Sequence, residues 1–559
     1  MTGRSTWSKA DHPRHRLAIV EPPGGRNGLA ACACPGLALL LASCSALFDF
    51  RVVQCQRDDE CRDLEGTGES LVCVDALCQP QCEANADCPQ HNRPHLCVKQ
   101  RCRRLLRDVC PEWLPGGEGP LADDTLLLGA FTDLASRPNT ARLNYGLALH
   151  ELNLRDERSD SLPLGRPIAL LVCDQSDKSY QAALAHLAGD LGVPAVIAGF
   201  QDITQLRERF LFQLESHNLF FLAPAESVTF ESTPDAYRDQ LWYLGGHPSD
   251  YAKTYAALLR IEAASLEQKT GRRQLRVYAL VDDKDEYGQA LKSGLTDELA
   301  QGEKPSYFDP DDDDLIAKLS NPLPDVLLVI SGWGATAVLD GLSKADAGDP
   351  WSEPDRGPLV VLSPRQATSD ALRAFVERDH EARSRRVVGV DWTVPQTSKL
   401  RRSYVKALQR YASVNSIDLS SEHAEHSENH YDAVYYLAYA ALAAPREAER
   451  MDGTWLAQGF KRLIEQPGEM ARQHIEVGPE GVKLAARLLA MEGLDVTFRG
   501  TLGPARFTDA RTREIDSGLF CYEEDAMEGR TVVRRQAAVY DPAQDEWRAE
   551  DFCFPGWLP

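Results

Sequence analysis

Three features are scarce or missing in this sequence of 559 residues, and each absence argues against a class of function. Basic residues are outnumbered: 61 Lys and Arg stand against 84 Asp and Glu, a formal net charge of −23. This balance disfavours nucleic acid as a partner, because a phosphate backbone is bound by a basic footprint. The apolar stretch at 29–41 is shorter than the roughly 20 residues that span a bilayer. The sequence also lacks the Gly-x-Ser-x-Gly, His-Glu-x-x-His and phosphate-loop motifs, so we expect no enzyme.

Cysteine, in contrast, is abundant and unevenly distributed. Eight of the fifteen cysteines lie between Cys55 and Cys102, in two units that repeat the same order of short, long and short gaps. Units this short cannot be built around a hydrophobic core, so crosslinks must stabilise them. Zinc would favour Cys-x2-Cys spacing and a reducing compartment, and this spacing is absent. We therefore predict a disulfide module at 55–110 in an oxidising compartment, which serves as a protein-contact module or as a rigid stalk.

The N-terminal segment indicates how the chain reaches that compartment. An apolar stretch at 29–41 follows Arg14, Arg16 and Arg26 and ends in Leu41-Ala42-Ser43-Cys44, which resembles the lipobox of bacterial lipoproteins. This resemblance implies a signal peptide at 1–43, lipidation of Cys44 and a tether at 44–54. The alternative is a plain signal peptide with an incidental cysteine. We expect a protein of the cell envelope, held at the membrane by its lipid anchor alone and facing the periplasm or the cell surface.

Lipidation of Cys44 leaves an even number of later cysteines, and all of them can pair. We predict disulfides for Cys55, Cys61, Cys73, Cys78, Cys82, Cys88, Cys97, Cys102, Cys110, Cys173, Cys521 and Cys553. For the last four, the preferred pairing is Cys110 with Cys173 and Cys521 with Cys553. Three connectivities remain open for these four.

Beyond a Pro/Gly-rich linker at 111–124, short apolar runs alternate with amphipathic segments, which is typical of parallel α/β sheets. Helices are expected at 141–154 and 180–191. Strands are expected at 125–131, 168–173, 195–199, 218–223, 275–282, 325–331, 359–362 and 386–390. One sheet with this many strands would be unusually wide. The pattern therefore predicts an α/β fold of two doubly wound parallel-sheet lobes after the disulfide module.

Several segments occur in the order and spacing of a known family: Asn144-Tyr145-Gly146, Leu222-Ala223-Pro224-Ala225, Tyr287-Gly288, Tyr431-Asp432-Ala433 and Gly500-Thr501-Leu502-Gly503-Pro504. On these segments the region 125–559 resembles the type I periplasmic binding proteins, in particular the leucine/isoleucine/valine-binding family that delivers ligand to ABC importers. The resemblance implies a lobe 1 of about 125–246 and 391–515, and a lobe 2 of about 247–390 and 516–559.

The resemblance also implies capture of a small ligand between the lobes. Carried over by position, the ligand-binding candidates are Asp202, Thr204, Ala225 and Ser227 in lobe 1 and Tyr287, Trp333 and Arg365 in lobe 2. Arg365 stands where the amino-acid binders commonly have an acidic residue, and Asp202 stands where they have a small hydroxyl residue. These two departures favour a small polar or anionic ligand of the amino-acid, amide or small-acid class.

Three functions fit this interpretation. The first is a solute-binding protein with an ABC permease as partner, the second is a ligand sensor with a signalling partner, and the third is a surface protein-interaction protein whose lobes bind no small molecule. We expect no cofactor and no metal. The histidines in 423–430 are interpreted as part of a polar loop, and Asp309 to Asp314 as charges favouring the start of a helix.

Overall fold

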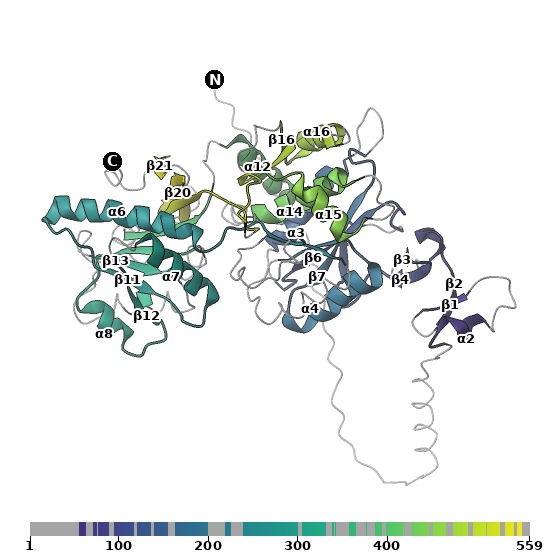
Figure 1. The fold of residues 1–559 in the computed structure, drawn as a ribbon, viewed down its shortest axis with the longest axis horizontal. Helices are drawn as coiled ribbons and strands as arrows, with labels where there is room; N and C mark the ends of the chain where they lie inside the picture. The colour runs from purple at the N-terminus through teal and green to yellow at the C-terminus, as the bar shows by residue number, and fades with distance from the viewer. Residues whose placement is uncertain are drawn as a thin grey trace, which may run out of the picture.

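The computed structural model places two α/β lobes side by side, with a small disulfide-rich module at the far end of one of them (Figure 1). It describes residues 55–62, 71–74, 77–88, 94–116, 120–135, 139–154, 162–198, 218–224, 239–299, 304–330, 338–339, 341, 357–364, 376, 386–393, 398–417, 419, 427–445, 451–465, 473–489, 496–509, 511–525, 531–541 and 545–549. The predicted leader and Cys44 lie outside the described residues. Among the described helices, none is both long and apolar enough to cross a membrane.

The module consists of two crosslinked units in tandem. Its elements are α2 (Asp58–Arg62), β1 (Leu71–Val74), β2 (Leu77–Pro80), η1 (Asn85–Asp87), β3 (His95–Val98) and β4 (Arg101–Arg104). In each unit the first cysteine pairs with the third and the second with the fourth; the bonds are Cys55–Cys73, Cys61–Cys78, Cys82–Cys97 and Cys88–Cys102. The two units that repeat in the sequence thus also share the same disulfide connectivity.

The second unit of the module is docked on lobe 1. The Asn85 side chain donates to Leu121 O at 3.0 Å, and His186 Nε2 contacts Leu105 O at 3.0 Å. A fifth disulfide, Cys110–Cys173, joins the end of the module to the lobe, and this is the pairing preferred from the sequence. Cys521 is also disulfide-bonded, while its predicted partner Cys553 lies outside the described residues.

Lobe 1 is built on a six-stranded sheet of order β10-β9-β8-β6-β7-β5. Its strands are β5 (Glu112–Leu114), β6 (Leu126–Thr132), β7 (Ile168–Asp174), β8 (Ala195–Ile197), β9 (Phe220–Ala223) and β10 (Leu241–Tyr243). All are parallel except the edge strand β5, which pairs antiparallel with β7. A second sheet of the lobe holds β16 (Gln473–Glu476), β17 (Val496–Gly500) and β18 (Gly503–Pro504).

Helices cover both faces of the lobe 1 sheet because its strands alternate between two apolar surfaces. Leu170 and Val172 of β7 join one core cluster, and Leu171 and Cys173 join the other. The helices on the first face are α3 (Thr140–Leu152), α12 (Lys399–Val414), α14 (Glu428–Ala443), α15 (Gly453–Lys461) and α16 (Pro479–Leu489), and those on the second are α4 (Asp177–Leu184) and the π-helical η2 (Ala185–Leu191). Both faces of such a parallel sheet are buried, as its continuous apolar runs predict.

Lobe 2 contains a mixed sheet of order β12-β11-β13-β14-β15-β19-β20-β21. The parallel part comprises β11 (Val277–Leu280), β12 (Ser306–Phe308), β13 (Val326–Val329), β14 (Leu359–Leu362) and β15 (Val387–Trp392). The antiparallel part is β19 (Ser517–Asp525), β20 (Thr531–Asp541) and β21 (Glu546–Ala549). The described helices of this lobe are α6 (Asp250–Thr270), α7 (Glu286–Glu298) and α8 (Leu315–Ser320). The predicted fold class, two parallel-sheet α/β lobes behind a disulfide module, is confirmed.

The crosslink between module and lobe gives a stability prediction. Replacing Cys110 and Cys173 together by alanine is expected to lower the free energy of unfolding by about 2–4 kcal/mol, because this bond closes a long loop of the unfolded chain. Urea unfolding followed by tryptophan fluorescence measures the change. The matched control, Cys61→Ala with Cys78→Ala, removes a bond within the first unit and is expected to leave the main transition in place. An equal shift in both variants would contradict the prediction.

Candidate functional site

The carboxyl ends of the strands in the two lobes are joined by three crossings of the chain. The first runs from β10 to the start of α6, and the second runs from the end of β15 to the start of α12. The third follows β10, where Arg513 N donates to Tyr243 O at 3.0 Å, and enters β19 at Ser517, which pairs with Trp392 at the end of β15. β10 and β15 end, and β19 begins, at the carboxyl edges of the two parallel sheets. The loops that follow the strands of each sheet therefore lie on the side of the other lobe. In open α/β sheets ligands bind outside these ends.

Three helices of lobe 1 begin at this end of the sheet. The Thr132 hydroxyl at the end of β6 contacts Asn139, the residue that caps α3. In the second turn of α12, the Tyr404 hydroxyl donates to Asn144 of α3 at 2.7 Å and lies 3.5 Å from Ser427, next to the start of α14. The three amino-terminal ends therefore share one side of the lobe. The N–H groups that the capping residues leave open, together with the partial positive charge of the helix ends, favour an anionic group there.

A buried polar network links lobe 1 to lobe 2 beside the second crossing. Arg401 of α12 donates to Glu428 of α14 at 3.2 Å, and to Gln536 of β20 in lobe 2 at 3.4 Å. Gln536 also accepts from the Thr393 hydroxyl at 2.7 Å. The side chains of Arg401 and Glu428 are only 10% and 1% exposed, so this ion pair is largely shielded from water. A buried pair of this kind requires both partners, because one charge left alone would be costly.

The third crossing is anchored by a second buried ion pair. Arg513 and Asp432 are both fully buried and lie 3.2 Å apart, and Asp432 also accepts from the backbone N–H and the hydroxyl of Thr501, both at 3.0 Å. Burial raises the pKa of Asp432, and the Arg513 charge opposes that rise. A Cβ at position 500 would lie 2.1 Å from Asp432 Oδ2, so glycine is required there for this close approach.

Several side-chain polar groups are buried without a hydrogen-bond partner among the described residues, and two of the residues concerned lie at a strand end or a helix start on the side of the other lobe. The hydroxyl of Ser363, directly after β14, is one of them, and Ser363 is 0% exposed. The other is Asn429 in the first turn of α14, whose amide oxygen and nitrogen both lack a described partner although the residue is only 4% exposed. Buried polar groups are nearly always paired, so each of these is a candidate for contact with a ligand.

The loop after β11 is acidic, but its carboxylates serve the loop itself. Asp282 accepts from Lys284 N at 2.8 Å, and Asp285 caps α7 by accepting from Tyr287 N at 3.2 Å. Asp283 is bound by Gln289 and Lys292, and these contacts lower its pKa. The negative charge of this loop is thus partly used to start helix α7.

Only one of the seven predicted ligand-binding residues lies among the described residues. Tyr287 occupies the first turn of α7 and is 0% exposed, within the core of lobe 2. The six others, Asp202, Thr204, Ala225, Ser227, Trp333 and Arg365, lie outside the described residues. All seven remain predictions.

The polar runs considered for metal binding take other roles where they are described. His430 packs edge-on against Tyr145 with ring centroids 5.6 Å apart, and burial lowers its pKa to about 4. His423 and His426 lie outside the described residues. In the acidic run, Asp309 and Asp312 accept from backbone N–H groups two residues on, and Asp312 pairs with Lys318 of α8. The described groups with metal-ligand spacing consist of disulfide-bonded cysteines.

Sequence reasoning missed Ser363 and Asn429 as candidates, although a signal existed for the first. Ser363 is the first polar residue after the apolar run of β14, which is where a ligand contact is expected in a parallel sheet. Asn429 stands in the run examined for histidine ligands, and its burial follows only from the packing of α14 on α3. The partners of Asp432 were equally hidden, because Arg513 is 81 residues away.

Comparison with solved structures identifies the fold. A protein of Silicibacter pomeroyi, provisionally named as a branched-chain amino acid ABC transporter, superimposes with a TM-score of 0.50 at 17% identity, over 78% of this chain and 100% of the other. An ABC transporter substrate-binding protein of Desulfitobacterium hafniense gives 0.49 at 16% identity over 74% and 99% of the two chains, and a leucine-binding protein of Thermotoga maritima gives 0.47 at 12% over 75% and 99%. No protein-family model and no curated protein sequence matches the chain.

The two lobes therefore have the fold of the type I periplasmic binding proteins. The solved neighbours are described as substrate-binding, leucine-binding or transport proteins. At this level of identity the likeness concerns the fold, and the function has to be argued from the site.

The anchor of the third crossing gives a pH-dependent prediction. Arg513→Met is expected to cost about 3–5 kcal/mol of stability at pH 7, because it leaves the Asp432 carboxylate buried without its counter-charge. In the variant the folded-state pKa of Asp432 rises further above its unfolded value. Between those two values the folded state binds an extra proton, so stability increases as pH falls.

The deficit of Arg513→Met relative to the parent chain should therefore shrink from pH 7 to pH 4 in urea titrations. The double variant Arg513→Met with Asp432→Asn has no carboxyl group to titrate at this site and serves as the control. A deficit that stays constant with pH would show that Asp432 is not the group left unpaired.

Proposed function

We propose that this chain is an extracytoplasmic solute-binding protein that captures a small polar ligand between its two lobes. The observation that carries the proposal is the arrangement of the three crossings, which set the carboxyl ends of each parallel sheet on the side of the other lobe. Such an arrangement suits ligand capture by hinge closure, which requires only that the closed form binds ligand better than the open form. No motif for bond-making chemistry competes with this interpretation.

The ligand is proposed to belong to the amino-acid, amide or small-acid class. Three helix amino-termini at one end of lobe 1 favour a carboxylate or another anionic group. Ser363 and Asn429, whose polar groups have no partner in the part of the chain that the structure describes, offer hydrogen bonds to a polar ligand. The proposed contacts also include Asp202, Thr204, Ala225 and Ser227 from lobe 1 and Tyr287, Trp333 and Arg365 from lobe 2.

We further propose that Cys44 carries a lipid anchor, so that the disulfide module stands between the membrane and the lobes. In this arrangement an ABC permease is the proposed partner, with lobe 1 at about 125–246 and 391–515 and lobe 2 at about 247–390 and 516–559. The docking of the second unit on lobe 1 through Asn85 and Cys110 favours a second candidate function, a ligand sensor. A module fixed on the lobe can pass a change in that lobe to a signalling partner, which import does not require.

A ligand screen tests the proposed capture. Amino acids, their amides and small carboxylic acids are added to the exported chain, and a specific ligand is expected to raise its melting temperature, since ligand at 100 times Kd stabilises the native state by about 2.7 kcal/mol. Ser363→Ala should weaken binding up to about tenfold while leaving the unliganded stability unchanged, because the hydroxyl has no described partner to lose.

The matched control for Ser363→Ala is Thr497→Val. Thr497 also has a buried hydroxyl without a described partner, and it lies within β17, in the second sheet of lobe 1. This variant should bind the ligand as the parent does. If no compound of the three classes shifts the melting temperature, the ligand-capture proposal fails and a protein-interaction role gains support.

The anchor has its own test. Cys44→Ser is expected to move the protein from the membrane fraction to the soluble fraction of the expressing bacterium, because the lipidated thiol is absent. Metabolic labelling with a fatty acid should mark the parent chain and not the variant. Equal membrane association of both would contradict a lipid anchor at this cysteine.

A further inference from the structure

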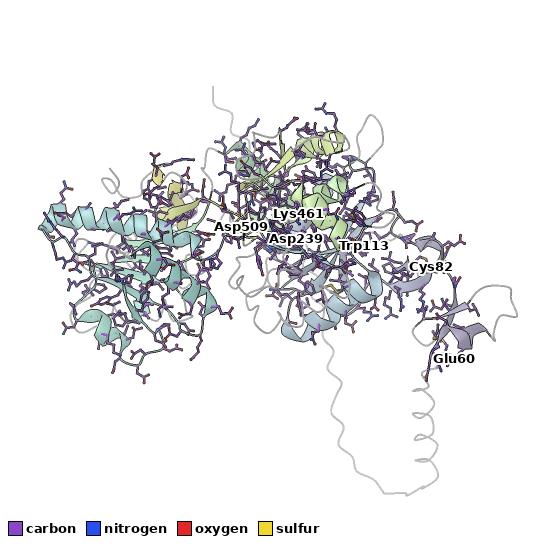
Figure 2. The ribbon with its side chains drawn as sticks, in the orientation of Figure 1. Glu60, Cys82, Trp113, Asp239, Lys461 and Asp509 are labelled. Carbon is purple, nitrogen blue, oxygen red and sulfur yellow. A yellow bond between two sulfur atoms is a disulfide. The ribbon has the colours of Figure 1, made fainter. Side chains whose placement is uncertain are left out.

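A pocket lies beside β10, an edge strand of the lobe 1 sheet. It is separate from the ligand contacts proposed for the crevice between the lobes. It is formed by β10, the end of α15 and the loop that leads to the third crossing, and its volume is about 260 Å³. Its walls include Trp242, Lys461, Glu465, Phe507, Asp509 and Arg511. In Figure 2, Lys461 and Asp239 lie close together on this part of lobe 1.

Aromatic rings form a fixed apolar wall of this pocket. Trp242 is 1% exposed and packs on Phe460 and Phe507 with ring centroids 4.9 and 5.1 Å apart. Its indole N–H donates to Asp239 O at 2.9 Å, which fixes the orientation of the ring. Phe460 and Phe507 are also in contact, at 5.6 Å. Of these rings only Phe507 is partly exposed, so a flat apolar group of a ligand would meet Phe507 on a rigid backing of Trp242 and Phe460.

Two cations stand against this wall and share one carboxylate. Lys461 Nζ lies 2.5 Å from Asp239 Oδ2, and Arg511 Nη2 lies 3.1 Å from Asp239 Oδ1. The Arg511 guanidinium lies over the Trp242 ring at 4.5 Å, and its Nε is buried without a hydrogen-bond partner among the described residues. Each oxygen of Asp239 binds one cation, but the two side chains carry two positive charges and further N–H donors, which are available to a ligand acceptor.

The backbone at Arg511 is held in an unusual conformation. Its φ is 64°, in the left-handed region that non-glycine residues seldom occupy. Arg511 N donates to Thr508 O at 2.9 Å, and Arg511 O accepts from Tyr243 N at 3.0 Å, which holds the residue in place. Strain of this kind persists where the surroundings fix a side chain in a particular position.

The opposite charge is present on the rim of the pocket. Glu465 pairs with Arg506 at 3.1 Å, with 39% of its own side chain exposed, and Asp509 is exposed. The lining thus combines cations on one side, carboxylates on the rim and aromatic rings between them. A ligand with a single charge would leave one of the two polar sides unmatched.

We propose that this pocket is a second binding site, for a small zwitterion with an apolar side chain. The ligand carboxylate meets Arg511 and Lys461, the apolar group packs on Phe507, and the ammonium group faces Asp509 and Glu465. The site is independent of the ligand proposed for the crevice. Because Arg511 lies two residues before Arg513, a ligand held here also contacts the loop that leads into the third crossing.

The test uses the exported full-length chain and L-phenylalanine as probe, with two derivatives that each lack one charge. Phenylalaninamide lacks the carboxylate and N-acetylphenylalanine lacks the ammonium group. Isothermal titration is expected to show phenylalanine binding at least tenfold more tightly than either derivative. Quenching of tryptophan fluorescence on binding should accompany it, since Trp242 lines the pocket.

Variants locate the bound probe. Lys461→Gln and Arg511→Asn are each expected to weaken phenylalanine binding at least tenfold; Lys461 is 39% exposed, and asparagine accepts the left-handed backbone at 511, so both variants should fold. The control Arg499→Gln removes an exposed cation of β17 outside the pocket lining and should bind as the parent does.

Two results would overturn the second site: no binding of phenylalanine to the parent chain, or binding that Lys461→Gln and Arg511→Asn leave unchanged. Binding lost in Ser363→Ala but kept in the two pocket variants would assign phenylalanine to the crevice, which supports the proposed function and removes the second site. Binding lost only in the pocket variants establishes the second site whatever the crevice ligand proves to be.

Discussion

The contact between Asp432 and Arg513 is the one on which the two-lobed arrangement most depends. Arg513 closes the third crossing by its backbone bond to Tyr243, and its side chain reaches through the lobe to a carboxylate on α14. Both side chains are fully buried, so water cannot solvate either charge in place of its partner. The third crossing is therefore fixed to the core of lobe 1 as far as residue 513, and its part that can bend lies between Arg513 and the start of β19.

Helix α14 makes several of the buried side-chain hydrogen bonds in lobe 1. Besides Asp432, α14 contributes Tyr431 and Tyr435, whose hydroxyls both donate to Glu151 of α3. Burial raises the pKa of Glu151, while the two tyrosine hydrogen bonds oppose that rise. Asp432, Tyr431 and Tyr435 of this buried helix are thus each paired with a group on another segment. Asn429, in the first turn of α14, has no hydrogen-bond partner among the described residues and lies at the end of the lobe that faces the other lobe, so it is a candidate ligand contact.

Much of the architecture could be predicted because strands and crosslinked repeats leave local patterns of apolar residues and cysteines in the sequence. Continuous apolar runs such as 359–362 predict buried parallel strands, and the structure places β14 at those residues. The cysteine spacing predicted a crosslinked repeat, and even parity led to the Cys110–Cys173 bond. The antiparallel strands β19 to β21 were missed, since charged residues interrupt their apolar pattern in a hairpin that extends the sheet beyond β15. Ion pairs between distant segments leave no local signal, and the pocket beside Trp242 arises only when α15, β10 and the 505–511 loop meet.

The bond between Cys110 and Cys173 has a consequence for the order of assembly. It stands two residues before β5, the short edge strand that completes the lobe 1 sheet against β7. Three residues of antiparallel pairing hold such a strand weakly, whereas a covalent link keeps it opposite its partner. A chain kept in a reducing compartment would carry an unfinished sheet with β7 at its edge. Formation of this bond then holds that edge closed, so the lobe 1 sheet is secured at β5 only under oxidising conditions.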